Sequence, residues 1–155
     1  MVSFLGEYDC RIDDKGRIKL PSELVKQIPE EAQNTFVVNR GFEDHLFLYP
    51  SNEWDKITEE IGQLNPYDKK TREFRWYFYR GANKVVLDKF FRILVPKRLF
   101  EYAGIDRDIV LFAHDKVIEI WNKEKYDTLL TKEPKDFAEL AEQVMVKRKN
   151  ASTGD

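Results

Sequence analysis

The sequence predicts an α+β fold made of two tandem units that share one plan and are related by pseudo-two-fold symmetry. The first observation is a frame of the form D-x-x-x-R-I-x-aliphatic-P, which occurs at residues 13–21 and again at residues 88–96. The second is that a short helical stretch, an apolar run and an aromatic helix start follow both copies in the same order. The third is the strand-like alternation of apolar and polar residues around each frame.

The first unit begins with an expected β-hairpin. Residues 8–12 alternate as a half-buried strand does, the turn residues 13–16 follow, and residues 18–20 alternate again. Pro21 ends this strand and opens a short helix at residues 23–27. The remaining expected elements of this unit are strands at residues 35–39 and 45–49 and an amphipathic helix at residues 51–63.

The second unit follows a basic, aromatic helix expected at residues 69–80. It repeats the plan with strands at 85–87 and 92–95, a helix at 97–102, strands at 109–112 and 117–121, and a further helix. The predicted division is a first unit at residues 5–55, a helical connector at 56–81, a second unit at 82–128, a C-terminal helix at 129–149 and a disordered tail at 150–155.

Composition limits the class of protein. The 155 residues carry a formal net charge of −2 and are 42% hydrophobic, which excludes a disordered chain. No apolar run approaches the roughly 20 residues of a membrane span, and charge lies near the start, where a signal peptide is apolar. We therefore expect a cytoplasmic protein. Each unit is too small to bury a large core alone, so we expect a homo-oligomer. The single Cys10 is expected to fill the core.

Charge is segregated along the chain. Residues 30–66 carry 2 Arg and Lys against 8 Asp and Glu, residues 67–98 carry 10 against 3, and residues 99–142 carry 6 against 11. One basic block between two acidic blocks favours a polyanionic partner. A charge run on a solvated helix is the common alternative.

The first frame carries candidate binding residues. On the expected hairpin, Arg11, Arg17 and Lys19 share the outward face, and a two-stranded ribbon fits the major groove of DNA. An exposed edge strand protected by charge is the structural alternative. Asp13 and Asp14 would repel phosphate, so we expect them to accept hydrogen bonds within the turn. A metal-binding carboxylate pair is a sharper alternative, but it lacks neighbouring ligands.

The whole pattern resembles the MraZ family. The resemblance rests on GEYDCRIDDKGRIKLP, RGFEDHLFLYPSNEW, REFRWYFYRGA and IEIW, and covers residues 1–145. It implies two SpoVT/AbrB-like swapped-hairpin units of the double-split β-barrel type. It also implies a nucleoid-associated bacterial transcriptional regulator that binds double-stranded promoter DNA near cell-division and cell-wall genes and assembles into homo-oligomeric rings. Carried over to this sequence, the DNA-binding residues are Arg11, Lys15, Arg17, Lys19 and Arg92, and the turn-structural residues are Asp13, Gly16 and Asp88.

The second frame departs from the family pattern. That pattern has Gly before the Arg in both copies, but Phe91 stands where the first copy has Gly16. Because a bulky residue in the left-handed conformation costs about 1–2 kcal/mol, we expect the second turn to have a different shape and Arg92 to contribute less than Arg17. The apolar pair Phe90 and Phe91 either tucks into its own unit or forms a subunit contact.

The helix expected at residues 69–80 interleaves aromatic and basic side chains. Such a segment can form a nucleic-acid surface, in which aromatics stack on bases while cations follow the backbone. A duplex offers no unstacked bases, so we favour a core that joins the two halves. His45 and His114 are expected to be satisfied loop residues. With no Ser-His-Asp frame, phosphate loop, cofactor fingerprint or zinc-ligand cluster in the sequence, we expect no enzyme activity, cofactor, metal site or small-molecule substrate.

The C-terminal helix has an apolar stripe at helical spacing, formed by Phe137, Leu140, Ala141, Val144 and Met145. We expect it to pack on a neighbouring subunit or back across its own. The same stripe supports an alternative function, an antitoxin-like interaction module that neutralises a partner protein. A nuclease is a third possibility, and it would need the metal ligands that the sequence lacks.

Overall fold

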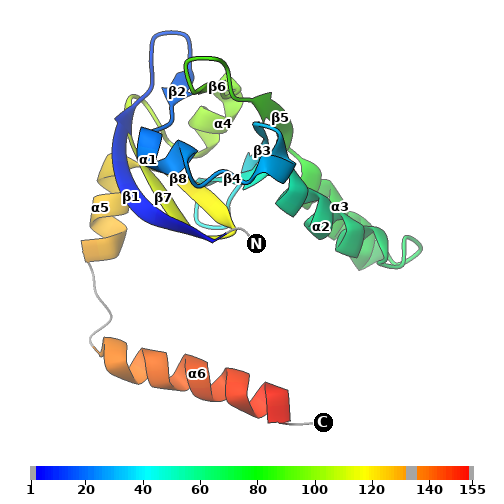
Figure 1. The fold of residues 1–155 in the computed structure, drawn as a ribbon. Coiled ribbons are helices and arrows are strands. Elements are labelled where there is room, and N and C mark those ends of the chain that lie inside the picture. Colours follow the sequence, from blue (N-terminus) through cyan, green and yellow to red (C-terminus); the bar gives the residue numbers. More distant parts are fainter. Residues whose placement is uncertain (1–2, 132–135, 154–155) are drawn as a thin grey trace. The chain divides into compact units, whose positions relative to one another are not determined.

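Residues 3–131 and 136–153 are described by a computed structural model of the chain, shown in Figure 1. The chain divides into two compact units, residues 1–124 and residues 125–155. The first contains the eight strands and α1 to α4, and the second contains most of α5 and the whole of α6. None of the helices in the described ranges has the length and apolarity needed to cross a membrane.

The elements follow one order twice. The first repeat contains β1 (Phe4–Arg11), β2 (Arg17–Lys19), α1 (Ser22–Val25), a 3₁₀ turn (Glu30–Ala32), β3 (Thr35–Arg40), β4 (Leu46–Pro50), α2 (Ser51–Gly62) and α3 (Lys69–Tyr79). The second contains β5 (Asn83–Val86), β6 (Arg92–Leu94), α4 (Lys97–Tyr102), β7 (Asp108–Asp115), β8 (Val117–Asn122), α5 (Lys123–Thr131) and α6 (Phe137–Thr153).

The predicted α+β class is confirmed. At the C-terminus, the last helix extends further than predicted. Helix α6 continues to Thr153, where a disordered tail was expected from residue 150. Residues 154–155 of that tail, and residues 132–135 of the segment expected as the C-terminal helix, lie outside the described residues.

The strands form two antiparallel sheets, and both combine the repeats. In the six-stranded sheet the order is β1-β7-β8-β4-β3-β5, which reads the same when the repeats are exchanged. The first strand of each repeat therefore pairs with the third strand of the other: β1 with β7, and β5 with β3. The second sheet is a two-stranded ribbon of β2 and β6.

The prediction that residues 8–12 and 18–20 pair with each other as a β-hairpin is wrong. Strands β1 and β2 share only the isolated bridge between Ile12 and Ile18, after which they enter different sheets. The alternating pattern fixes which face of a strand is buried but does not fix its partner. Here the partner comes from the other repeat, so that the backbone groups of β1 and β2 are paired and their apolar faces meet one common core.

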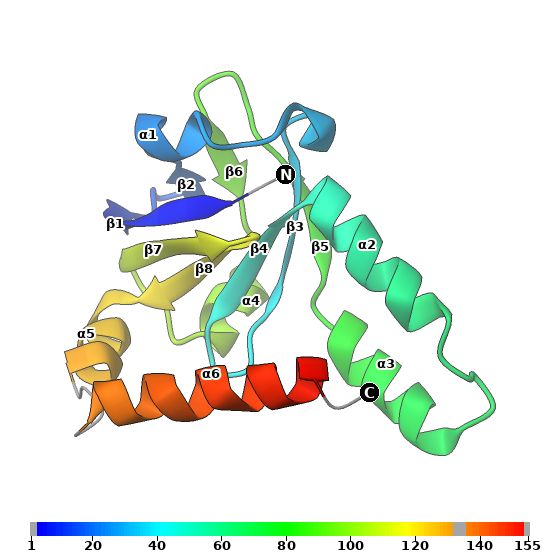
Figure 2. The ribbon, with the colours of Figure 1, turned by 60° about the horizontal axis from the view of Figure 1, so that its bottom comes forward.

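That core draws on both repeats. Its fully buried members include Phe4, Ile18, Leu20, Leu24, Phe36, Leu46, Leu48, Ile93, Leu99, Ile109, Leu111 and Ile118. Helices α2 and α3 lie antiparallel beside the β3 and β5 end of the sheet (Figure 2). Helix α2 contacts β3 and β4, whereas α3 contributes no buried residue.

Because every first and third strand is paired across repeats, we predict that residues 1–81 and residues 82–155 will not fold as separate monomers. Each half alone leaves all four of its strands without their partner from the other repeat, and half of the core exposed. Circular dichroism of each half, combined with its mass from analytical ultracentrifugation, checks this, and co-expression of the halves should restore the native signal. A folded monomeric half would contradict the prediction.

Candidate nucleic-acid interface

The ribbon of β2 and β6 places positive side chains from both repeats on one face. Its register pairs Arg17 with Leu94, Ile18 with Ile93, and Lys19 with Arg92. Ile18 and Ile93 are fully buried, so the alternation of a strand directs the other side chains to the opposite, outward face. Those outward residues are Arg17, Lys19, Arg92 and Leu94.

Loop 1, residues 12–17, leads into β2 and is organised by the carboxylate of Asp13. Its Oδ1 accepts hydrogen bonds from the backbone N–H groups of Lys15 and Arg17, both at 2.9 Å. Its Oδ2 accepts a hydrogen bond from the Nε of Arg17 at 2.7 Å. The backbone N–H of Gly16 also donates to the carbonyl of Asp13 at 3.0 Å. One side chain thus holds both the turn and the arginine that follows it.

Loop 2, residues 87–92, has the same bonding, so the expectation of a different shape is wrong. Oδ1 of Asp88 accepts from the N–H groups of Phe90 and Arg92 at 2.8 and 2.9 Å, and Oδ2 accepts from the Nε of Arg92 at 2.8 Å. Phe91 adopts φ = 63°, on the same side as the 83° of Gly16. The side chains of Arg17 and Arg92 are exposed to nearly the same extent, 27% and 28%.

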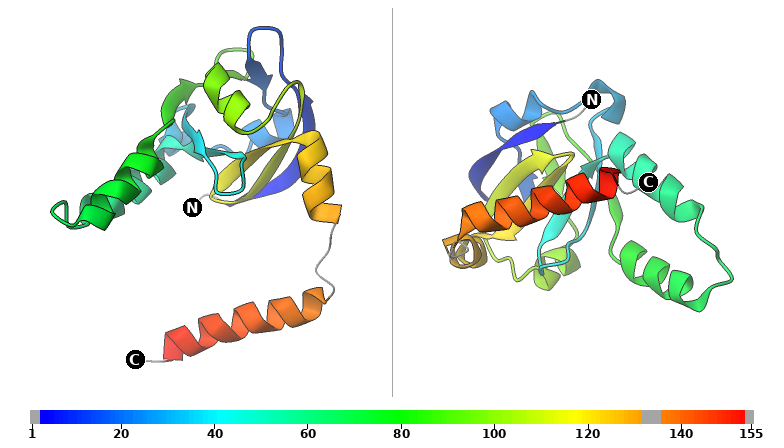
Figure 3. Two further views of the ribbon diagram at one scale, coloured as in Figure 1. Left: turned by 180° about the vertical axis from the view of Figure 1, so that it is seen from behind. Right: turned by 90° about the horizontal axis from the view of Figure 1, so that it is seen from below.

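Hydrogen bonds across the ribbon explain why Phe91 keeps a glycine-like conformation. The N–H of Leu20 donates to the carbonyl of Phe91 at 2.8 Å, and the N–H of Val95 donates to the carbonyl of Gly16 at 3.2 Å. The two bonds are equivalent under exchange of the repeats. Together with the Asp88 carboxylate they hold the backbone of loop 2, and this outweighs the steric preference of Phe91. Both loops project at the same end of the unit formed by residues 1–124 (Figure 3).

The electrostatics of the two loops are alike. Hydrogen bonds from the Arg17 backbone, from its side chain and from the Lys15 backbone lower the pKa of Asp13. Partial burial by itself raises the pKa of Asp88, but the bonds from Arg92 and Phe90 outweigh it, so the net shift is also downward. Within the described residues, the side chains of Arg17 and Arg92 donate through Nε, so their Nη groups remain for an external acceptor.

The other candidate residues differ in their surroundings. Lys15 is exposed in loop 1, and Lys19 lies opposite Arg92 on the ribbon. Arg11 belongs to the six-stranded sheet, where it forms an ion pair with Asp108 at 3.2 Å instead of sharing a hairpin face with Arg17.

Asp14 does not join Asp13 in a carboxylate pair for a metal. It forms an ion pair with Arg107 of the second repeat, while Asp13 is engaged by Arg17. Within the described residues no group of three His, Cys, Asp or Glu side chains could hold a metal ion. No sequence signal indicated the Arg107 contact, because the two residues are far apart in the chain.

His45 is the loop residue immediately before β4, His114 lies within β7 and not in a loop as expected, and both contact Glu119. His45 is buried and stacks on Trp121 at 4.3 Å between ring centroids, and its Nε2 lies 3.3 Å from Glu119. The side chain of His114 bonds to Glu119 and Asp115.

Burial raises the pKa of Cys10 to about 11, with the charge of Asp9 adding to the shift, so its thiol is protonated at neutral pH. None of these groups lies on the ribbon.

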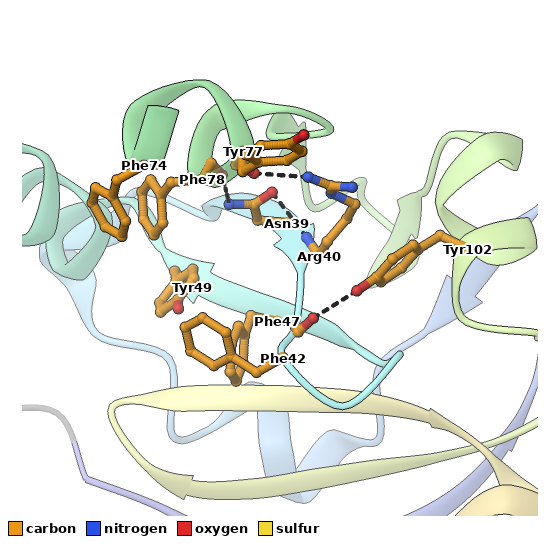
Figure 4. Close-up of a pocket in the computed structure, with 10 residues that line it drawn as sticks. Asn39, Arg40, Phe42, Phe47, Tyr49, Phe74, Tyr77, Phe78 and Tyr102 are labelled. Carbon is orange, nitrogen blue, oxygen red and sulfur yellow. Dashed lines mark hydrogen bonds between the residues drawn. The ribbon is translucent and has the colours of Figure 1, made fainter. Parts of the chain in front are cut away.

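The aromatic side chains of α3 form an open groove and not the core that we expected. Phe74, Trp76 and Tyr77 are 46%, 66% and 68% exposed. Phe74, Tyr77 and Phe78 border an apolar pocket of about 300 Å³ together with the β3–β4 turn and Tyr102 of α4, and we call this pocket the aromatic groove (Figure 4). The strand exchange already joins the two halves, so α3 is left at the periphery, where Phe78 and Tyr79 pack on Trp54 of α2.

Some cations of the basic block have structural partners. A guanidinium Nη of Arg75 donates to the carbonyl of Ile61 at 2.7 Å, and Arg72 donates to the carbonyl of Pro66. These bonds close the connection between α2 and α3. Part of the positive charge of the basic block therefore has a structural role within the chain and is not directed at a binding partner.

The lowered pKa values predict the pH range in which the loops stay closed. An isolated Asp titrates near 3.9, and Asp13 and Asp88 should both titrate below that value. A carboxyl group whose pKa is lowered by folding contributes stability above its unfolded pKa, and this contribution is lost as the pH falls through the folded pKa. An NMR titration of the two side-chain carboxyl carbons checks this.

The matched variant is Arg17→Gln, which keeps the backbone donors of loop 1 but removes the charge. It should raise the pKa of Asp13 part of the way toward its ordinary value and leave that of Asp88 unchanged. A titration of either carboxyl at or above 3.9 in the wild type would contradict the assigned geometry.

Comparison with known proteins agrees with the repeat. The family model described as "MraZ protein, putative antitoxin-like" matches residues 3–75 and again residues 78–148. Relatives described as transcriptional regulator MraZ come from Christiangramia forsetii, Cytophaga hutchinsonii and Clostridium acetobutylicum. They are 40%, 36% and 39% identical over 94%, 96% and 79% of this chain, and over 94%, 99% and 84% of their own chains. The two model matches fall on the two structural repeats and relatives span nearly the full length, so the chain belongs to the MraZ family.

Proposed function

We propose that this chain is a sequence-specific, DNA-binding transcriptional regulator that acts at the nucleoid near cell-division and cell-wall genes. The observation that carries the proposal is the outward face of the ribbon, where strand exchange assembles Arg17, Lys19 and Arg92 beside two identically bonded loops. The relatives' description as transcriptional regulators supports it. The proposal includes no catalytic step.

The strand exchange also supports the finer fold assignment. We infer that the units at residues 5–55 and 82–128 are SpoVT/AbrB-like swapped hairpins, separated by a helical connector at residues 56–81. In such a unit the two strands that flank a turn leave each other to pair with the second copy, as β1 and β2 do here.

The geometry suggests how the ribbon reads DNA. A two-stranded ribbon fits the major groove, where Arg donates two hydrogen bonds to guanine. Arg17 and Arg92 are held by carboxylates, so little side-chain freedom is lost on binding. Lys15 and Lys19 are placed to neutralise phosphates, whereas Arg11 has its charge already balanced by Asp108 and contributes less.

Exposed apolar surface supports assembly of several copies. The aromatic groove borders the basic helix α3, and α6 presents an exposed stripe that includes Leu140 and Val144. The first half of α6 also carries Glu139, which complements the charge of α3. We infer that α6 of one copy covers the aromatic groove of the next in a homo-oligomeric ring, so that several ribbons bind repeated sites and gain avidity.

Arg17→Ala and Arg92→Ala should weaken binding to promoter DNA by comparable amounts, about 1–3 kcal/mol for each lost base contact. The shared loop geometry is the reason for near equality. Gel shift or fluorescence anisotropy on the duplex upstream of the coding sequence measures the effect. Lys116→Ala, which removes a cation from the β7–β8 turn, is the control. Unchanged binding by both arginine variants would rule out the ribbon as the DNA-binding face.

The same titrations at several salt concentrations test the nature of the contact. The logarithm of the binding constant should fall linearly with the logarithm of salt concentration, with a slope of about −0.9 per neutralised phosphate. A flat dependence for the wild type would count against DNA as the partner.

The double variant Leu140→Asp with Val144→Asp should lower the mass of the oligomer in light scattering, because it places charge on the apolar stripe of α6. Glu142→Gln, nearly opposite on the helix, should leave the mass unchanged. A wild-type monomer would exclude the ring. An oligomer that survives the double variant would free α6 for another protein, and it would favour the antitoxin-like alternative, which co-purification of a partner would then test.

A further inference from the structure

Phe91 adopts an energetically unfavourable backbone conformation. Its φ of 63° lies in the left-handed region, and the other described non-glycine residues with positive φ are the polar residues Gln33, Asn34, Asp44 and Asp115. Asn and Asp tolerate this region, but a bulky aromatic residue there is strained. The repeat shows that the loop itself has no need of a side chain at this position, because Gly16 supports the same bonds in loop 1.

Burial of the Phe91 ring within the chain is incomplete and does not offset the backbone strain. It is 45% exposed and Phe90 is 54% exposed, and neither ring belongs to the buried core of the described residues. Full burial in its own unit, one of the two alternatives that the sequence left open, therefore does not occur. Two exposed aromatic residues, one of them in a strained backbone conformation, are explained if they contact a binding partner.

The position of Phe90 indicates which partner. The guanidinium of Arg92 lies 4.9 Å from the centre of its ring and the ammonium of Lys89 lies 5.2 Å from it. The apolar pair is thus flanked by two cations, one of which is the ribbon arginine of loop 2. A polyanion with apolar groups in its groove offers a partner both to the two cations and to the rings. DNA offers such groups as the C5-methyl of thymine, which Phe contacts in the major groove.

We propose that Phe90 and Phe91 form an apolar reading tip that contacts thymine methyl groups beside the base bound by Arg92. This inference rests on the proposed function and adds a specificity that loop 1 lacks, since the equivalent positions there are Lys15 and Gly16. The two loops share a backbone but read different chemistry.

The test begins with Phe91→Gly, which gives loop 2 the residue that loop 1 already uses. Relief of strain should leave the thermal unfolding midpoint unchanged or raise it, while affinity for promoter DNA should fall about five- to ten-fold. Phe90→Ala should weaken binding to a similar extent. Tyr67→Ala, which removes an 88% exposed aromatic ring from the α2–α3 connection, is the matched control.

The decisive measurement compares the promoter duplex with the same duplex containing deoxyuridine for thymidine, which removes only the methyl groups. The wild type and Arg17→Ala should both lose affinity for the deoxyuridine duplex. Phe91→Gly and Phe90→Ala should lose much less, because the contact is already absent and the two changes are not additive.

Each other outcome overturns the inference. If the phenylalanine variants bind both duplexes as the wild type does while Arg17→Ala fails, the reading tip is wrong and the proposed function stands. If the wild type ignores the methyl groups, the contact is not to thymine. A lower unfolding midpoint for Phe91→Gly would show a structural role, and a changed oligomer mass would show a subunit contact. If the wild type binds no promoter DNA, the proposed function fails with it.

Discussion

Each repeat supplies strands that are paired only by the other repeat, and the position of every candidate binding residue follows from this exchange. The β2–β6 ribbon exists because the halves meet, with Ile18 and Ile93 side by side in the common core. Their burial turns the neighbouring positions outward. Arg17 and Arg92, far apart in the chain, are thereby placed on one face.

Within this frame the loops use acidic residues to prepare a basic surface. Asp13 and Asp88 partly neutralise the arginines, which lowers the gross attraction for a polyanion. They also fix the turn amides and the guanidinium orientation, so that less side-chain entropy is lost on binding. For a site that must distinguish bases and not only attract phosphate, orientation matters more than net charge, because phosphate contacts position a protein while base contacts specify the sequence.

Much of the fold could be predicted from periodicity and the repeated frame, since both report local structure. The partner of each strand could not, because the alternation of residues 8–12 is satisfied equally by β2 or by β7. Phe91 shows the complementary failure. Its intrinsic preference predicts a different turn, but the Asp88 carboxylate and the bond from Leu20 fix the backbone. The prediction that the aromatic side chains of α3 form a core was wrong for a third reason. Composition does not distinguish a core from an apolar surface that another copy could cover.

The equality of the two backbones has a consequence for how the ribbon could lie on a duplex. A ribbon with identical side chains in both halves would bind equally well in either orientation. Here the pseudo-two-fold axis relates Lys19 to Leu94 and Gly16 to Phe91, so the outward face is polar on one side and more apolar on the other. Turning the ribbon around would exchange a phosphate-seeking lysine for an exposed leucine. In the proposed complex, the backbone symmetry positions two arginines and the side-chain asymmetry selects one direction along the DNA.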